Sequence, residues 1–132
     1  MTNGPEPGGL LDTSVFIAFE TGRLIANLPE NGAVSVVTLA ELEMGVLMAG
    51  DPTTVARRLH TLSQAQTLFS PLPVDIHTAH VFAELSAEAR KAGWRANAMD
   101  GWIAATAVAH KLTLYTQDRD FARFRRLSVV FV

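Results

Sequence analysis

Four acidic residues, far apart in the chain, have the types and positions that metal-assisted chemistry requires. Asp12 ends a short apolar run, Glu41 lies shortly after a second run, and Asp118 lies shortly after a third. Asp100 stands near the start of an Ala-rich segment. Four carboxylates in one pocket would repel one another and could not all stay ionised without cations. Hard divalent ions such as Mg²⁺ or Mn²⁺ take oxygen ligands, so they would suit this set.

Each acid also has a purely structural interpretation, which the sequence leaves open. Asp12 can cap the helix that is expected from Ser14. Thr38 and Glu41 have the spacing of a capping box, with Thr38 as the N-cap. Asp118 can cap a short helix that follows it. Taken one at a time, these residues do not separate capping from chemistry.

Asp100 is harder to explain as a structural residue. Asn97, three positions earlier, gives only a weak capping arrangement, and Asp100 is the sole charged residue between Asn97 and His110. A helix that is apolar on every side is normally buried, and a buried carboxylate needs a partner. The segment contains no Lys or Arg to provide one. The sequence therefore favours a functional role for Asp100.

Short β-like runs alternate with longer helical ones, which predicts an α/β fold with a mainly parallel sheet covered by helices on both faces. Strands are expected at 10–12, 33–37, 112–116 and 128–132, and helices from residue 14 and at 38–49, 53–69, 75–92 and 99–110. Ligands of such sheets gather at the carboxyl ends of the strands. Asp12, Glu41 and Asp118 follow strands, so we expect them to meet there, together with Asp100.

The composition restricts the class of protein. A chain of 132 residues with 48% hydrophobic and 18% charged residues predicts one folded domain and excludes disordered and coiled-coil classes. The absence of cysteine excludes disulfides, thiolate zinc sites and cysteine nucleophiles. The Gly- and Pro-rich stretch 1–9 is expected to be a disordered tail before a domain at 10–132. No apolar run is long enough to span a membrane.

The small net charge says little about nucleic acid. The formal charge is −2, but without the four negative charges of the proposed cluster it becomes +2. Acids that surround divalent cations no longer repel phosphate, so placement of charge matters more than its sum. Three arginines close to Asp118 could neutralise phosphates: Arg119, Arg123 and Arg126. A solvated charged face paired with Asp120 stays open as the alternative.

Four segments, taken together, resemble the PIN-domain ribonucleases, and among them the VapC-type toxins of bacterial toxin–antitoxin modules. The segments are LLDTSVFIA at 10–18, VVTLAELEMGV at 36–46, AMDGWIAATAVAH at 98–110 and LYTQDRDF at 114–121. They occur in the family's order and at similar separations, and the likeness extends over 10–132. The resemblance implies a PIN-like α/β/α sandwich.

The resemblance also implies a site and a reaction. The family's acidic quartet, which holds one or two Mg²⁺ or Mn²⁺ ions, corresponds to Asp12, Glu41, Asp100 and Asp118. Ser14 and Thr116 match polar positions that support the metal site, and Asp120 matches a more variable position just outside it. The implied activity is that of an endoribonuclease, in which metal-activated water attacks an RNA phosphodiester in line. The pair Gly101-Trp102, through its tryptophan, is bulkier than the small or aliphatic residues usual in the family and is expected to alter the neighbouring groove.

The resemblance further implies a toxin of a type II system in the bacterial cytoplasm, a homodimer, an RNA substrate and a cognate VapB-like antitoxin. Apolar residues over 15–19 and 39–48 would suit an amphipathic antitoxin helix. The main alternative is a catalytically silent PIN fold that binds RNA or protein.

Other classes fit the sequence less well. His77, His80 and Glu84 share one helical face, but such a spacing without a motif is weak support for zinc. A receiver-like signalling domain would need a lysine after the last strand, and both lysines of the chain precede the last two strands. A phosphatase with an aspartate nucleophile would need a second Asp two residues after Asp12, where Ser14 stands.

Overall fold

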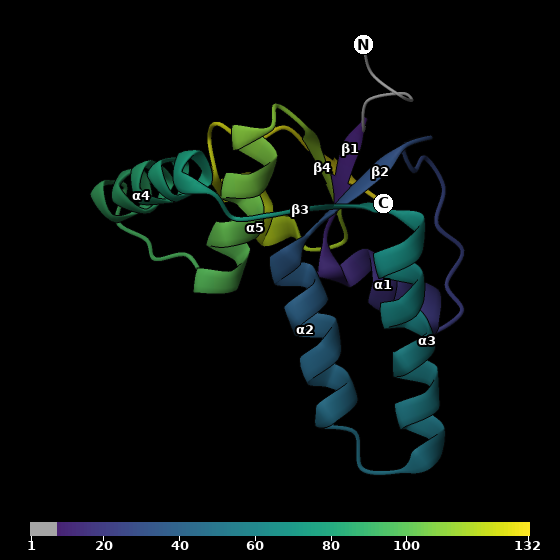
Figure 1. Ribbon diagram of the computed structural model, residues 1–132. Coiled ribbons are helices and arrows are strands. Elements are labelled where there is room, and N and C mark those ends of the chain that lie inside the picture. The colour runs from purple at the N-terminus through teal and green to yellow at the C-terminus, as the bar shows by residue number, and fades with distance from the viewer. Residues whose placement is uncertain (1–7) are drawn as a thin grey trace.

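The computed structural model describes residues 8–132, so the expected N-terminal tail lies outside the described residues except for Gly8 and Gly9. Gly9 already belongs to the first strand. The elements follow in the order β1 (Gly9–Leu11), α1 (Thr13–Glu20), β2 (Gly32–Ser35), α2 (Val36–Leu47), α3 (Pro52–Leu68), β3 (Ser70–Leu72), α4 (Ile76–Lys91), α5 (Ala98–Ala109), β4 (Thr113–Thr116), the short 3₁₀ helix η1 (Arg119–Arg123) and β5 (Val129–Phe131). Figure 1 shows their arrangement. No helix within 8–132 is both long and apolar enough to cross a membrane.

The five strands form one sheet in the order β3-β2-β1-β4-β5, and every pairing is parallel. The central strand β1 pairs with β2 and β4, with Leu10 opposite Ala33 on one side and Leu114 on the other. The carboxyl ends of β1, β2 and β4 therefore lie side by side, which is where parallel sheets bind ligands. The predicted parallel α/β sheet is confirmed.

Helices cover both faces of the sheet, and the alternation of side chains along the strands separates two cores. Leu10 and Ala33 pack with α4 and α5, whereas their neighbours Leu11 and Val34 pack with α1, α2 and α3. Figure 1 shows α4 and α5 on one side of the strands and α1 and α3 on the other, with the α2–α3 pair extending beyond the sheet. This arrangement is the predicted α/β/α sandwich.

β3 was not expected from the sequence, where Pro71 and the nearby Pro73 indicated only the end of a helix. Proline has no backbone N–H and is excluded from central strands. β3 is an edge strand and pairs only with β2 among the described strands, with Pro71 opposite Val34. The edge position explains why a proline is compatible with pairing at this point.

The start of α2 differs from the prediction. The β-branched pair at 36–37 suggested a strand up to residue 37, but α2 begins at Val36, because Ser35 is its N-cap and accepts a hydrogen bond from the Val37 amide at 3.1 Å. Thr38 is buried within the helix and is not the N-cap. The expected capping box is therefore wrong, and the Glu41 carboxylate is left to make other contacts.

Candidate active site

Asp12 joins the end of β1 to the start of α1 and is only 4% exposed. Its Oδ2 accepts hydrogen bonds from Ser14 Oγ at 2.7 Å and Thr116 Oγ1 at 2.8 Å, and from the Ser14 amide at 3.3 Å. Asp12 is thus the N-cap of α1, as the structural interpretation proposed. Its Oδ1 has no hydrogen-bond partner within 8–132, so one oxygen stays available for a ligand.

Ser14 and Thr116 tie the loops after β1 and β4 together. Their hydroxyl oxygens lie 3.2 Å apart, and Thr116 is completely buried. Ser14 Oγ accepts from the Gln117 amide at 3.0 Å, while Thr116 Oγ1 accepts from the Asp118 amide at 3.0 Å. These bonds fix the backbone that carries Asp118 beside Asp12.

Glu41 contacts the start of α1 through Thr13, which no sequence motif marks as a site residue. Thr13 Oγ1 donates to Glu41 Oε1 at 2.6 Å and lies 3.0 Å from Thr38 Oγ1. The contact joins residues 28 positions apart. No local pattern reveals such a contact, although the Asp-Thr-Ser sequence at 12–14 already drew attention to the neighbours of Thr13.

Asp100 lies half-buried in the first turn of α5. Asn97 caps this helix, since its Oδ1 accepts from the Met99 amide at 2.9 Å and the Asp100 amide at 3.4 Å. Burial raises the pKa of Asp100 to about 6, helped by the negative charges of four acids, in decreasing order Asp12, Asp118, Glu41 and Asp120. The structure therefore brings the four predicted acids into one electrostatic cluster, with Asp120 at its margin.

Asp118 and Asp120 occupy the start of η1. Asp118 is the N-cap, and its Oδ1 accepts from the Asp120 amide at 2.9 Å. Asp120 is exposed and lines a small cavity of about 70 Å³ together with Asp100 and Arg123. Asp118 therefore both caps a helix and belongs to the cluster, as Asp12 does.

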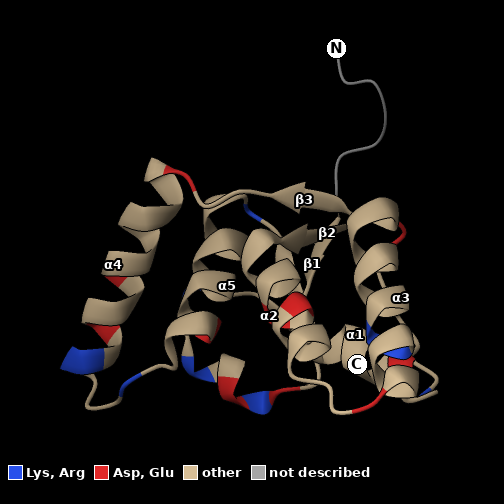
Figure 2. Cartoon of the chain, turned by 60° about the horizontal axis from the view of Figure 1, so that its bottom comes forward, with Lys and Arg blue, Asp and Glu red and all other residues tan. Residues whose placement is uncertain are grey.

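No basic side chain balances the cluster within 8–132. The ion pairs of this part of the chain are Arg57–Glu20, Arg126–Glu84 and Arg126–Glu88, and none includes one of the four acids. Figure 2 shows acidic positions on α2 and at the base of α5, with acidic and basic positions in the segment beneath them. Among these residues, no three His, Asp or Glu side chains form a ready-made metal cluster. The carboxylates are neighbours that an ion would still have to draw together.

The three predicted phosphate-binding arginines do not converge. Arg126 pairs with Glu84 at 3.3 Å and Glu88 at 3.5 Å, and not with Asp120 as the structural alternative proposed. Arg119 lies over the Phe131 ring, 4.7 Å from its centre. Arg123 lies over the Trp94 ring at 4.4 Å and alone among the three lines the cavity that contains Asp100.

Two further sequence features take structural roles. The α4 face with His77 and His80 belongs to no metal-binding group among residues 8–132, and its Glu84 pairs with Arg126.

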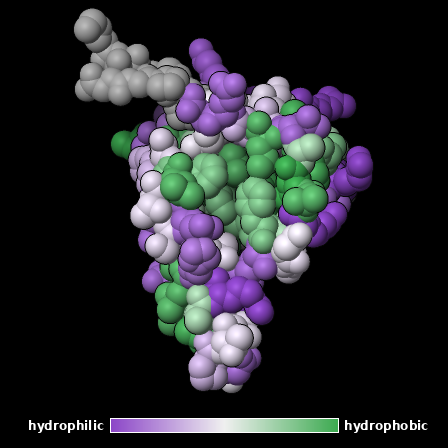
Figure 3. Space-filling model, turned by 90° about the vertical axis from the view of Figure 1, so that its right-hand side faces the viewer, coloured by the Kyte–Doolittle hydropathy of each residue, from purple (hydrophilic) through white to green (hydrophobic). Residues whose placement is uncertain are grey.

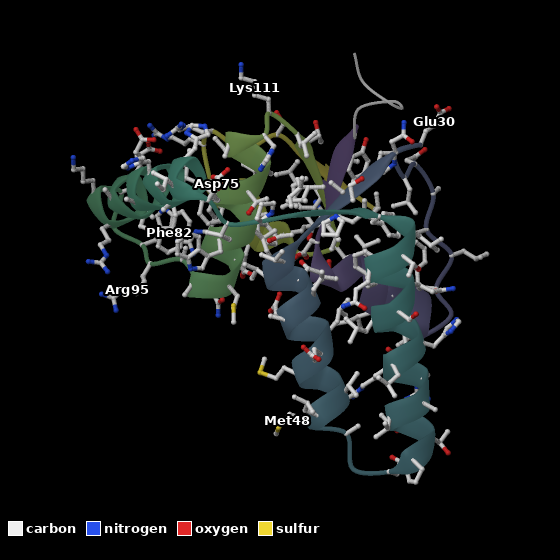
Figure 4. All side chains as sticks on the ribbon, viewed as in Figure 1. Glu30, Met48, Asp75, Phe82, Arg95 and Lys111 are labelled. Atoms are coloured by element: carbon white, nitrogen blue, oxygen red, sulfur yellow. The ribbon has the colours of Figure 1, made fainter. Side chains whose placement is uncertain are left out.

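Trp102 stacks on Phe82 with ring centres 3.8 Å apart and an angle of 11° between the ring planes. Figure 4 shows Phe82 between α4 and α5, so the bulk of Trp102 is accommodated in helix packing.

The fold agrees with a comparison to protein families, in which the PIN domain matches residues 9–127. The chain belongs to the PIN-domain family. This PIN domain is 44% identical over 128 residues to Ribonuclease VapC4 of Mycobacterium tuberculosis, covering 93% of this chain and 95% of the relative. It is 49% identical over 109 residues to Ribonuclease VapC8 of the same species, covering 81% of this chain and 96% of the relative.

Solved structures give the same result. A toxin–antitoxin complex from M. tuberculosis, VapBC-5, matches with a TM-score of 0.81 and 38% identity, covering 96% of this PIN domain and all of that chain. FitAcB from Neisseria gonorrhoeae matches with a TM-score of 0.74 and 32% identity, covering 91% and 94%. The resemblance drawn from the four sequence segments is confirmed, and all four acids lie inside the matched range.

Proposed function

We propose that this PIN-domain protein is the toxin of a type II toxin–antitoxin system and cleaves RNA as a divalent-metal-dependent endoribonuclease. The observation that carries the proposal is the cluster of Asp12, Glu41, Asp100 and Asp118, which has no basic partner within the described residues. Relatives named VapC ribonucleases, which match most of the chain, support RNA as the substrate.

The donor set fits Mg²⁺ or Mn²⁺. All four side chains offer carboxylate oxygens, the ligands that hard cations prefer, and the chain has no cysteine. Three of the acids each keep one oxygen without a hydrogen-bond partner in 8–132: Oδ1 of Asp12, Oε2 of Glu41 and Oδ2 of Asp118. Such an ion, when bound, would polarise the scissile phosphate and lower the pKa of an attacking water.

The other residues of the site have positioning roles. Ser14 and Thr116 hold Oδ2 of Asp12, so its Oδ1 has a fixed direction. Thr13 holds Oε1 of Glu41, and Asn97 fixes the helix start that carries Asp100. Because the pKa of Asp100 is raised to about 6, protons compete with the cation there in mildly acidic solution. Cleavage should therefore fall as the pH decreases through 6.

The test is cleavage of defined RNAs by the purified protein with Mg²⁺, with Mn²⁺ and with excess EDTA. We expect cleavage only with the ions, and none by Asp12→Asn. Asp51→Asn is the matched control, because Asp51 is an exposed acid that caps α3 away from the cluster. Full cleavage in excess EDTA would refute the proposal, whereas ion binding without cleavage of any RNA would favour the silent PIN fold.

The proposal includes a VapB-like antitoxin as partner, a homodimer and the bacterial cytoplasm as location. Large apolar side chains of α1 and α2 are exposed, among them Ile17 at 51%, Met44 at 52% and Leu47 at 79%. Figure 4 shows Met48 at the far end of α2, and Figure 3 shows hydrophobic side chains gathered on the side of the molecule that carries α3. An amphipathic antitoxin helix would cover such surfaces.

A further inference from the structure

A groove beside the acidic cluster has a different chemistry from the cluster itself. Its main part is a cavity of about 420 Å³ between the end of α4 and the chain around η1. This volume falls in the range of about 300–1,000 Å³ that small-molecule sites occupy. The smaller cavity that contains Asp100 and Asp120 shares three lining residues with it, Trp94, Arg123 and Phe124. The groove therefore adjoins the candidate active site.

The groove has an aromatic and aliphatic wall. Trp94 and Phe124 pack edge to face, with ring centres 5.1 Å apart, and Leu85 and Ala89 of α4 complete the apolar lining. The Arg123 guanidinium lies 4.4 Å from the centre of the Trp94 ring. Aromatic rings and planar guanidinium groups are the surfaces on which proteins stack unpaired nucleobases.

The rim of the groove is positively charged. Lys91, Arg123 and Arg125 line it and form no ion pair within 8–132. The one acid of the rim, Glu88, lies 3.5 Å from Arg126, which also pairs with Glu84, so the three basic residues outnumber the acid of the rim. The charge therefore changes sign along the groove, from the acids around Asp100 to this basic rim. If one phosphate of an RNA strand bound cations held by the acids, the next phosphate could contact the basic residues of the rim.

We propose that this groove, termed the Trp94 groove (Leu85, Ala89, Lys91, Trp94, Arg123 and Phe124), binds an unpaired nucleotide of the RNA substrate next to the scissile phosphate. The base lies against the Trp94 ring, which the buried Phe124 supports from one edge. Arg123, which lines both cavities, contacts the phosphate between that base and the cleavage position. The inference rests on the proposed ribonuclease function, because one strand must reach both sites. A paired base cannot enter such a groove, so the site selects single-stranded RNA.

The test compares binding of a short single-stranded RNA and its duplex in EDTA, where cleavage does not interfere, and then measures cleavage of the single strand with Mg²⁺. We expect Trp94→Ala and Arg123→Ala each to weaken single-strand binding about 10-fold, the effect of one stacked base or one phosphate contact. The Arg123 variant should also reduce the slope of log affinity against log salt by about 0.7. In cleavage, both variants should raise KM more than they lower kcat.

Matched variants separate stacking from charge and from folding. Trp94→Phe keeps an aromatic surface and the packing on Phe124, so it should retain most of the affinity. Arg123→Lys should keep the salt dependence but bind more weakly than the wild type, because an ammonium group does not stack as a plane. Arg90→Ala, an exposed change one residue from Lys91 and outside the groove lining, should leave RNA binding unchanged.

The outcomes distinguish the groove from the nuclease. If the wild type cleaves RNA and the Trp94 and Arg123 variants bind and cleave as it does, the groove inference is overturned and the proposed function stands. If the variants lose RNA binding but the wild type never cleaves, the groove inference stands and the nuclease proposal fails. Loss of affinity for a protein partner alone, with RNA binding intact, would assign the groove to that partner and overturn the inference.

Discussion

Replacing Asp100 with Asn should stabilise the metal-free protein while abolishing its activity. Asp100 is half-buried in α5 and surrounded by the charges of Asp12, Asp118 and Glu41, with no basic partner in the described residues. Asparagine has nearly the same shape and cannot ionise, so the packing of α5 is kept and the repulsion is removed. A cluster of acids that is arranged for a cation must weaken the fold when no cation is bound.

The pKa of Asp100 sets the size of the effect. A pKa of about 6 in place of the ordinary 3.8 corresponds to at most about 3 kcal/mol of lost stability above pH 6. Asp100 is only half-buried, and screening by solvent reduces this to about 1 kcal/mol. For a domain of 132 residues, that amounts to a rise in Tm of about 3–6 °C.

The direction of the pH dependence follows from the same shift. The folded state holds the Asp100 proton more tightly than the unfolded state, so the destabilisation is complete above pH 6, decreases as the pH falls from 6 to 3.8, and is absent below 3.8. Thermal unfolding in EDTA should therefore show Asp100→Asn above the wild type at pH 7.5 and level with it near pH 3.8. Added Mg²⁺ should raise the Tm of the wild type and leave the variant nearly unchanged, because only the wild type keeps the complete ligand set.

Asp51→Asn is the control for this experiment, since it also removes one negative charge but keeps a side-chain oxygen that can cap α3. It should not raise the Tm in EDTA at pH 7.5, and it should retain the response to Mg²⁺. The account of the cluster would be refuted if Asp100→Asn melted at or below the wild-type temperature at pH 7.5 in EDTA. If Mg²⁺ raised the Tm of Asp100→Asn as much as that of the wild type, Asp100 would not be a metal ligand.

Three further substitutions test neighbouring contacts. Thr116→Val removes one of the three donors to Oδ2 of the buried Asp12 and should lower stability by about 1–2 kcal/mol in urea unfolding; an unchanged midpoint would contradict the role of this bond. Thr13→Val frees Glu41 and should weaken Mg²⁺ binding about 10-fold in calorimetry, whereas Thr13→Ser should restore it. Asp75→Ala removes the N-cap of α4. Because the hydrogen bonds from the Thr78 amide and hydroxyl lower the pKa of Asp75, the resulting loss of Tm should be complete at neutral pH, shrink as the pH falls below 3.8, and vanish only below the lowered pKa. A loss independent of pH would exclude this carboxylate as its source.

The sequence was sufficient for the sandwich because its central strands are buried on both faces and therefore occur as short apolar runs. Leu10 and Leu11 illustrate this, since each enters a different core. β3 escaped prediction because a proline at an edge strand looks like a loop in the sequence. The predicted start of α2 was two residues too late. Val36 and Val37 favour a strand by their residue type, but the N-cap Ser35 starts the helix at Val36.

Contacts between elements that are distant in the chain could not be predicted from the sequence. The bond from Thr13 to Glu41 depends on how α1 meets α2, and the stacking of Arg123 on Trp94 depends on the end of α4 lying beside η1. The three arginines near Asp118 are equivalent in the sequence because all lie within eight residues of it. Folding separates them, since Arg126 meets two glutamates of α4 and only Arg123 lines the cavity that contains Asp100.

Helix capping and metal binding do not exclude each other at these acids, because a carboxylate has two oxygens and can serve both. Asp12 uses Oδ2 and Asp118 uses Oδ1 to accept backbone hydrogen bonds at helix starts, and the other oxygen of each has no partner within 8–132. The hydrogen bonds to one oxygen fix the side chain, so the other oxygen is held in a fixed position. A residue that caps a helix at the carboxyl end of a parallel strand is thus already oriented for a ligand at that edge. Capping at Asp12 and Asp118 therefore supports a role in metal binding, because the same bonds that start the helix hold the carboxylate in position.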